Sequence, residues 1–155
     1  MTVFRLTAEK FKNDLTGKGA EIYGGRWNPV GYALLYTSQS RALASLEIMV
    51  NTVPGVMPVD YYILEIEIPD TSPVYEIKEN ELPKEWGKME NYTQLAGYNI
   101  IKQHKYLAIK VPSACIIHEY NYLINPGHPS MKDIKLLLAE PFIFDERLFS
   151  SKINI

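Results

Sequence analysis

Short apolar runs separated by polar turns recur along the whole chain and predict a domain of many short elements. The clearest pattern lies at residues 61–68, where Leu64, Ile66 and Ile68 alternate with glutamates, as in a half-buried strand. Other apolar runs predict further strands at residues 3–6, 32–38, 73–77, 106–112, 115–125 and 134–148, the last as closing strands or as a short helix and a strand. Strands therefore outnumber helices.

Helical spacing of apolar residues marks two further segments. Residues 40–52 follow two candidate caps, Ser38 and Ser40. Their predicted apolar stripe consists of Ala42, Leu43, Leu46, Met49 and Val50. Residues 92–105 also look helical, despite an internal glycine, whereas residues 13–32 are rich in glycine and turn residues and predict a long loop. Strands and helices in mixed order indicate an α+β domain.

Length and charge narrow the class of protein. The 155 residues suit one domain, 1–155, with a single core. The formal net charge of -2 gives no general attraction to nucleic acid or to an anionic membrane. One cysteine, Cys115, excludes an internal disulfide and a cysteine metal site. Without a membrane-length apolar run or a signal-peptide core near the N-terminus, the expected location is the cytoplasm.

The stretch GGRWNPVGYALLYTSQSRALASLE, residues 24–47, concentrates chemically active side chains. Glu47 falls at the edge of the predicted helical stripe, so it is either an exposed helix residue or a carboxylate partly desolvated in a cleft. Arg26 follows two glycines, which fits a turn with a solvated arginine or a loop that approaches a phosphate. Tyr36 ends a strand, where its ring suits the core or stacking on a planar ligand.

Other candidates are weaker when taken singly. Arg5 alternates with Phe4 and Leu6, so it faces the opposite side of its strand and lines a cleft or meets solvent. Asn28 precedes a proline and fits a turn, and Ser113 fits a turn cap or a ligand contact. The three histidines show no metal-ligand spacing, so no metal site is expected. Neither common glycine-rich phosphate-binding motif is present.

Taken together, these segments resemble the RES-domain family of bacterial toxins. The matching pieces are FRL near the N-terminus, residues 24–47, then VPSA, NYLINP and FIFDERL. The resemblance implies an ADP-ribosyltransferase-like mixed β-sheet with flanking helices and an NAD-binding cleft. By position it implies Glu47, Tyr36 and Arg5 as catalytic residues, and Arg26, Asn28 and Ser113 as cofactor-binding residues. The motifs leave open which arginine binds phosphate.

The resemblance also implies an activity and partners. We expect the toxin of a type II toxin–antitoxin system that cleaves the nicotinamide–ribose bond of NAD+, by hydrolysis or phosphorolysis, with NAD+ as substrate and no metal. A Xre-type helix-turn-helix antitoxin is the expected partner, and a homodimer within that complex is left open. The alternatives are a protein ADP-ribosyltransferase toxin and a non-catalytic nucleotide-binding module.

The expected chemistry needs few residues. Nicotinamide leaves NAD+ as a neutral molecule, so no acid has to protonate it, in contrast to the paired carboxylates of ordinary glycosidases. One ionised carboxylate, Glu47, would stabilise the positive charge that develops on the ribose. The arginines would hold the phosphates, Tyr36 would stack on a flat ring, and Ser113 would orient Glu47 or bind ribose.

Overall fold

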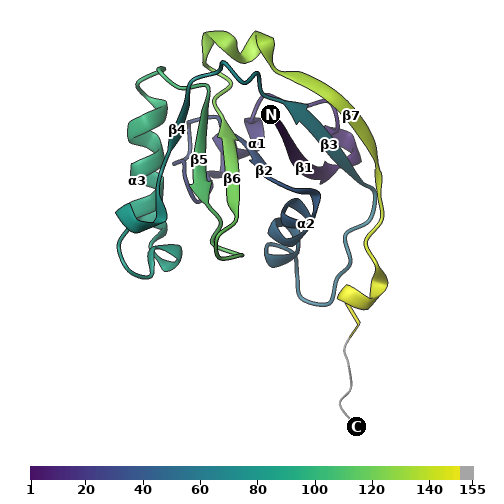
Figure 1. Cartoon of the computed structure of the whole chain (residues 1–155). Coiled ribbons are helices and arrows are strands. Elements are labelled where there is room, and N and C mark those ends of the chain that lie inside the picture. Colours follow the sequence, from purple (N-terminus) through teal and green to yellow (C-terminus); the bar gives the residue numbers. More distant parts are fainter. Residues whose placement is uncertain (151–155) are drawn as a thin grey trace.

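A single twisted sheet of seven strands forms the centre of the molecule (Figure 1), a computed structural model that describes residues 1–150. Its strands follow the order β4-β5-β6-β2-β1-β3-β7, and every neighbouring pair is antiparallel except β4 and β5. The strands are β1 (Thr2–Ala8), β2 (Leu35–Ser38), β3 (Tyr61–Glu67), β4 (Val74–Glu76), β5 (Ala108–Pro112), β6 (Tyr120–Ile124) and β7 (Lys135–Phe142). Each predicted range contains a strand and the α+β class is confirmed, but the range 115–125 was too long, because residues 115–119 form a turn and the strand there is Tyr120–Ile124.

The described residues also form three α-helices, which are α1 (Lys18–Tyr23), α2 (Arg41–Val50) and α3 (Glu90–Ile101). The two longer helices match the predicted ones, and the second candidate cap is used: the Ser40 hydroxyl accepts from the Leu43 amide at 3.1 Å. Short 3-10 helices occupy several connections, at Glu9–Phe11, Glu79–Glu81, Trp86–Lys88, Pro129–Asp133 and Glu146–Leu148.

Two details of the helix prediction were wrong. Within α2, Ala42 and Val50 are exposed, whereas Leu43 and Ala44 are the buried pair, so the apolar stripe is displaced by about one residue. The expected loop at residues 13–32 contains the six-residue helix α1. That helix buries none of its side chains, so it leaves no apolar period in the sequence.

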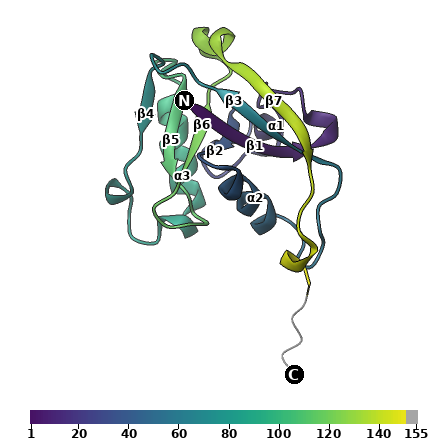
Figure 2. The same ribbon diagram turned by 45° about the vertical axis from the view of Figure 1, so that its right-hand side comes forward.

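Helices α2 and α3 pack on the same face of the sheet, under different halves of it (Figure 2). Phe4 lies opposite Ser38 in the sheet, and Tyr36 lies opposite Leu123, so these four side chains share one face. Phe4 packs with α2 residues in one core cluster, and Tyr36 and Leu123 pack with α3 residues in another. The opposite face carries a third cluster, which includes Val3, Leu35 and Ile124.

Helix α3 approaches the chain at Trp27 so closely that its Gly97 has no room for a side chain. A Cβ on Gly97 would lie 1.8 Å from the Trp27 carbonyl oxygen. The glycine that weakens the helical pattern in the sequence is therefore the residue that lets this helix seat against the loop before β2. Trp27 itself is 2% exposed and packs on Trp86, with ring centroids 5.7 Å apart.

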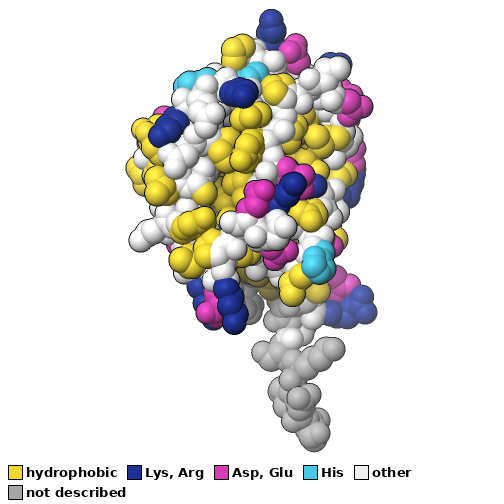
Figure 3. All heavy atoms as spheres, turned by 60° about the vertical axis from the view of Figure 1, so that its left-hand side comes forward, with side chains coloured by type: hydrophobic (Ala, Val, Ile, Leu, Met, Phe, Trp, Pro, Cys, Tyr) yellow, Lys and Arg dark blue, Asp and Glu magenta, His cyan; other side chains and the backbone are white. Residues whose placement is uncertain are grey.

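The surface retains many large apolar side chains. Figure 3 shows hydrophobic groups in a broad band on the side that carries β4 and α3, with charged side chains next to them. Exposed examples from the described residues are Tyr75, Tyr92, Leu95 and Ile117. No helix among residues 1–150 has both the length and the apolar character that a membrane crossing requires.

Candidate functional site

Glu47 lies on α2 where the helix faces the neighbouring half of the sheet. The preceding turn of the helix buries Leu43 and Ala44, and this burial fixes the side of α2 that meets the sheet. Glu47 is half-buried, at the edge of that contact, which decides between the exposed and the partly desolvated positions that its place beside the apolar stripe left open. At the start of the helix, Arg41 forms ion pairs with Glu65 on β3 and Glu140 on β7. Together these contacts hold the helix, and hence the carboxylate, against the sheet.

Two side chains from outside α2 donate to the same oxygen of Glu47. The Ser113 hydroxyl, just after β5, donates to Oε1 at 2.8 Å. The Asn121 amide, on β6, donates to Oε1 at 2.7 Å. None of the described residues donates to the other oxygen, Oε2. The carboxylate is therefore held at one oxygen and offers the other to a ligand.

The Ser113 hydroxyl has no freedom to point elsewhere. It is 5% exposed, and it accepts from the backbone amides of Cys115 at 3.0 Å and Ile116 at 3.1 Å. A serine oxygen has two lone pairs, so these amides occupy both of them. Its single proton is left for Glu47. The Ser113 hydroxyl therefore caps the turn and contacts Glu47 at the same time, although the sequence alone left these as separate possibilities.

A pocket opens next to this serine. Its volume is about 360 Å³, within the range of small-molecule sites. It lies between the loop after β5 and the segment of 3-10 helices before α3. The lining residues are Glu79, Leu82, Pro83, Lys84, Glu85, Trp86, Gly87, Ser113, Ala114 and Ile117. Ser113 lines this pocket and also donates to Glu47, so the carboxylate is one hydrogen bond away from the pocket lining.

Arg26 is hydrogen-bonded to Gly87, one of the residues that line this pocket. Its Nη1 donates to the carbonyl oxygen of Gly87 at 2.7 Å, across 61 positions of chain. The guanidinium is half-buried, and its Nε and Nη2 atoms donate to none of the described residues. Nη1 of the guanidinium therefore holds Gly87, while Nε and Nη2 remain able to bind an anion.

The turn that carries Arg26 is held from beneath by Tyr36 and Asn28. The Tyr36 hydroxyl donates to Asn28 Oδ1 at 2.7 Å and accepts from the Trp27 amide at 3.0 Å. Asn28 is 0% exposed, and its Nδ2 donates to the carbonyls of Ala20, Pro29 and Tyr32. A ligand that bonded to the Asn28 side chain would have to displace one of these partners. Burial raises the pKa of Tyr36, so its hydroxyl stays neutral at physiological pH.

Arg5 lies apart from these residues. It alternates with Phe4 and Leu6, as predicted, and it pairs across the sheet with Leu64, a residue of the cluster on the face away from α2. Its Nε is buried and has no hydrogen-bond partner among residues 1–150. Burial lowers the pKa of Arg5, and the nearby charge of Asp14 opposes that shift. Glu47 and Arg26 are thus each hydrogen-bonded to a residue that lines the pocket, Ser113 and Gly87, whereas Arg5 lies on the other face of the sheet.

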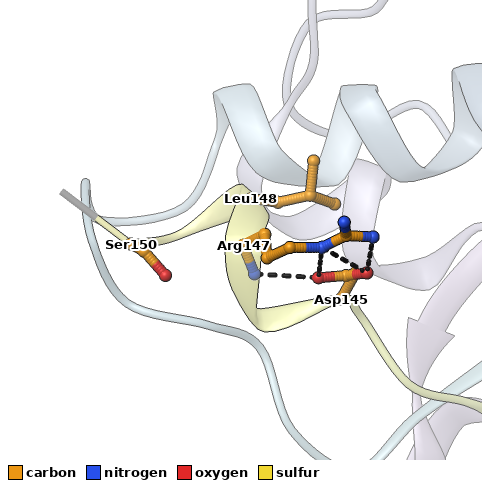
Figure 4. A pocket seen from close by; sticks show the side chains of 4 residues that line it. All are labelled: Asp145, Arg147, Leu148 and Ser150. Atoms are coloured by element: carbon orange, nitrogen blue, oxygen red, sulfur yellow. Dashed lines mark hydrogen bonds and ion pairs between the residues drawn. The ribbon is translucent and has the colours of Figure 1, made fainter. Parts of the chain in front are cut away.

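A second hollow lies at the C-terminal side of the described chain. It measures about 560 Å³ and is lined by Asp145, Arg147, Leu148 and Ser150 (Figure 4). The charged groups of Asp145 and Arg147 pair with each other at 2.6 Å. No predicted site residue lines this hollow. Among residues 1–150, no three histidine, cysteine or acidic side chains are grouped as a metal site would require.

Asn121 is the residue at this site that the sequence did not single out. It lies in the NYLINP motif, where an amide residue on an alternating strand signals a polar group placed among apolar ones. Its Oδ1 accepts from the Ser38 hydroxyl at 2.7 Å, and Ser38 lies directly opposite it in the sheet. The sequence therefore contained an indication that Asn121 is unusual, but the pairing of β2 with β6 is needed to show that it contacts Ser38 and Glu47.

Comparisons with known proteins agree on one family. The model of the RES domain matches residues 2–145. The chain is 36% identical over 140 residues to the Prs ADP-ribosylating toxin of Sphingobium sp. (strain YBL2), covering 88% of this chain and 87% of the relative. It is 31% identical to a protein named Toxin Res from Yersinia enterocolitica, over 96% and 99% of the two chains. It is 32% identical to Toxin Res of Pseudomonas putida, over 96% and 100%.

A solved structure shares the fold. The match is to the crystal structure of the M. tuberculosis MbcT–MbcA toxin–antitoxin complex. Its TM-score is 0.74, with 18% sequence identity, over 96% of this chain and 86% of the matched one.

Proposed function

Because the chain belongs to the RES domain family, we propose that it is a toxin that cleaves the nicotinamide–ribose bond of NAD+. The observation that carries this proposal is the state of Glu47. One oxygen of the carboxylate is held by Ser113 and Asn121, and the other meets no donor among the described residues. The carboxylate is hydrogen-bonded to Ser113, which lines a pocket, and Arg26 is hydrogen-bonded to Gly87, another residue of the same lining.

A carboxylate held in this way suits a reaction that develops positive charge. As the bond to nicotinamide breaks, the ribose gains oxocarbenium character and the leaving group departs neutral. A fixed negative charge beside the ribose stabilises that transition state more than the ground state. No second carboxylate is needed to protonate the leaving group, in contrast to a glycosidase. The single Glu47 is sufficient.

The other residues of the site support binding and placement. We assign the phosphates of NAD+ to Arg26, whose free nitrogens can form paired hydrogen bonds to an anion. Tyr36 and Asn28 hold the turn that carries Arg26, so their contribution is to its position. Ser113 orients the carboxylate. Arg5, on the far face of the sheet, is assigned to the fold rather than to the substrate.

The acceptor of the ADP-ribose can be water, phosphate or a protein. Protein modification is the second candidate, and the 36% identity to a protein named an ADP-ribosylating toxin favours it. The two candidates share the chemistry at Glu47 and differ in what attacks the ribose. The MbcT–MbcA complex has the same fold and contains an antitoxin. We therefore also propose an antitoxin partner, of the Xre type, and action on the cytoplasmic pool of NAD+.

The test is to incubate the purified chain with NAD+ carrying label in its adenosine part. Nicotinamide release, free ADP-ribose, ADP-ribose phosphate and labelled protein are measured with and without phosphate and with a cell extract. The matched variants are Glu47→Gln, which keeps the shape of the side chain, and Glu81→Gln, which alters an exposed glutamate outside the pocket. Release that Glu47→Gln abolishes and Glu81→Gln keeps would support the proposal. Equal release from Glu47→Gln would overturn it.

A further inference from the structure

We infer that Asn121 is a positioning residue for Glu47, and that Ser38 sets the direction of the Asn121 amide; this inference rests on the proposed function. The three side chains form a chain of hydrogen bonds on one face of the sheet. Ser38 on β2 donates to Asn121 on β6 at 2.7 Å, and Asn121 donates to Glu47 Oε1 on α2 at 2.7 Å. Three elements distant in sequence are thereby joined at one carboxylate oxygen.

The direction of the amide follows from the chemistry of its neighbours. An ionised carboxylate only accepts hydrogen bonds, so the Asn121 group that faces Glu47 has to be the NH₂. Its carbonyl then faces Ser38 and needs a donor, which the hydroxyl supplies at 2.7 Å. Ser38 is 4% exposed, so this carbonyl meets a protein hydroxyl rather than bulk water. Without Ser38, the amide would lose the partner that favours one of its two orientations.

The hydrogen bonds to Oε1 of Glu47 also determine the direction of Oε2. Ser113 and Asn121 approach Oε1 from different elements, the loop after β5 and strand β6. Two donors on one oxygen fix the plane and rotation of the carboxylate, so Oε2 keeps a defined direction. Asn121 therefore contributes to the orientation of the carboxylate.

The described residues place charged or titratable groups near Glu47 on the loop after β5 and on α2 itself. On the loop that follows Ser113, the pKa of the Cys115 thiol is raised by burial, and the negative charges of Glu47 and Glu119 add to that shift. Arg41, six residues earlier on α2, forms ion pairs with Glu65 and Glu140. The groups on Oε1 itself are uncharged, so a charge introduced at position 121 would act directly on Glu47.

The experiment compares Asn121→Ala and Asn121→Asp with the wild-type chain. Asn121→Ala removes one donor to a charged group, and we expect kcat for nicotinamide release to fall about 10- to 100-fold with little change in KM. Asn121→Asp keeps the shape and the Ser38 contact but places a second carboxylate beside Glu47. Like charges at this distance share a proton. Activity of this variant should therefore need a higher pH than the activity of the wild-type chain.

The matched control is Asn99→Asp, which adds the same charge on the exposed side of α3. It should keep the wild-type rate and pH profile. Carbon-13 NMR of the Glu47 carboxyl provides a readout besides activity, since its protonation should move to higher pH in Asn121→Asp and stay in place in Asn99→Asp. Unchanged kcat, pH profile and NMR titration in both Asn121 variants would overturn the inference while leaving the proposed function intact.

A wild-type chain that releases no nicotinamide under any condition would overturn the proposed function instead. The NMR titration then still tests whether Asn121 contacts Glu47. A shifted titration would retain the link from Asn121 to Glu47, and an unshifted one would reject it. Ser38→Ala is the second variant, and we expect a loss of kcat in the same direction as Asn121→Ala but smaller.

Discussion

Ser113 donates its hydroxyl proton to Oε1 of Glu47 at 2.8 Å, although 66 positions of chain separate them. The contact joins the loop after β5 to helix α2. Two backbone amides hold the hydroxyl oxygen in turn. A serine that only capped a turn would not need a carboxylate as its acceptor, so the contact ties the loop to the proposed chemistry.

Ser113→Ala should therefore impair turnover without preventing folding. The change leaves Oε1 with one donor and leaves the Cys115 and Ile116 amides without an acceptor. We expect kcat for nicotinamide release to fall about tenfold or more, because the hydrogen bond is to a charged group. Steady-state kinetics on folded protein would measure it. Ser45→Ala is the control. The Ser45 hydroxyl lies on α2, as Glu47 does, but it donates to the Arg41 carbonyl and not to Glu47.

The two candidate arginines should behave differently. Arg26→Ala removes the proposed phosphate anchor and the link to Gly87, so KM for NAD+ should rise by about 10- to 100-fold. Arg26→Lys should recover little of the loss, because lysine lacks the planar fork. Arg5→Gln alters a residue on the other face of the sheet, and its KM should stay at the wild-type value. A KM increase confined to Arg5→Gln would reverse the assignment.

Tyr36→Phe should destabilise the protein and make its free energy of unfolding depend less on pH in alkaline solution. The variant leaves buried Asn28 Oδ1 and the Trp27 amide without a partner, at a cost of about 1–3 kcal/mol in free energy of unfolding. Burial raises the pKa of Tyr36 above 10.0, its unfolded value. The folded state thus binds a proton that the unfolded state releases, and stability is lost as pH rises above about 10.

Denaturant unfolding at several pH values measures both effects. The wild-type chain should lose up to about 1.4 kcal/mol per pH unit above pH 10 through this group. Tyr36→Phe should be less stable at neutral pH, and its stability should fall less steeply in alkaline solution. Parallel curves for the two proteins would show that Tyr36 titrates as it does in the unfolded chain.

Gly97→Ala should be among the most disruptive single changes in the chain. Its Cβ would lie 1.8 Å from the Trp27 carbonyl oxygen, so α3 or the Trp27 loop would have to move. We expect a loss of more than about 3 kcal/mol or failure to fold, seen in thermal unfolding. Gly19→Ala is the control, because open space surrounds Gly19 within α1. It should raise stability by about 0.5–1 kcal/mol, since alanine favours a helix.

Local patterns were sufficient for much of the fold. The alternation at residues 61–68 predicted β3, and the Ser40 cap predicted the start of α2, because both signals lie within a few residues. The place of Glu47 at the edge of the helix contact followed in the same way. Helix α1 was missed because it buries no side chain. A helix without an apolar face has no period to detect.

The composition of the site could not be predicted in the same manner. Sequence reasoning showed that Arg5 faces away from Phe4 and Leu6, but only the layout of the sheet shows that α2 covers the other face. Asn121 and Ser38 meet because β2 pairs with β6, more than 80 positions away. Gly97 was seen as a weakness of a helix, whereas it is a point of close packing. Each of these facts depends on long-range pairing.

The two amides that hold Ser113 also bear on inhibitor chemistry. With both lone pairs engaged and its proton directed to Glu47, this oxygen is a poor nucleophile. Fluorophosphonates and related reagents that trap activated serines should leave the chain unlabelled. Compounds that place a cationic ring beside Glu47 should bind instead, since they imitate the positive charge that develops on the ribose in the proposed reaction.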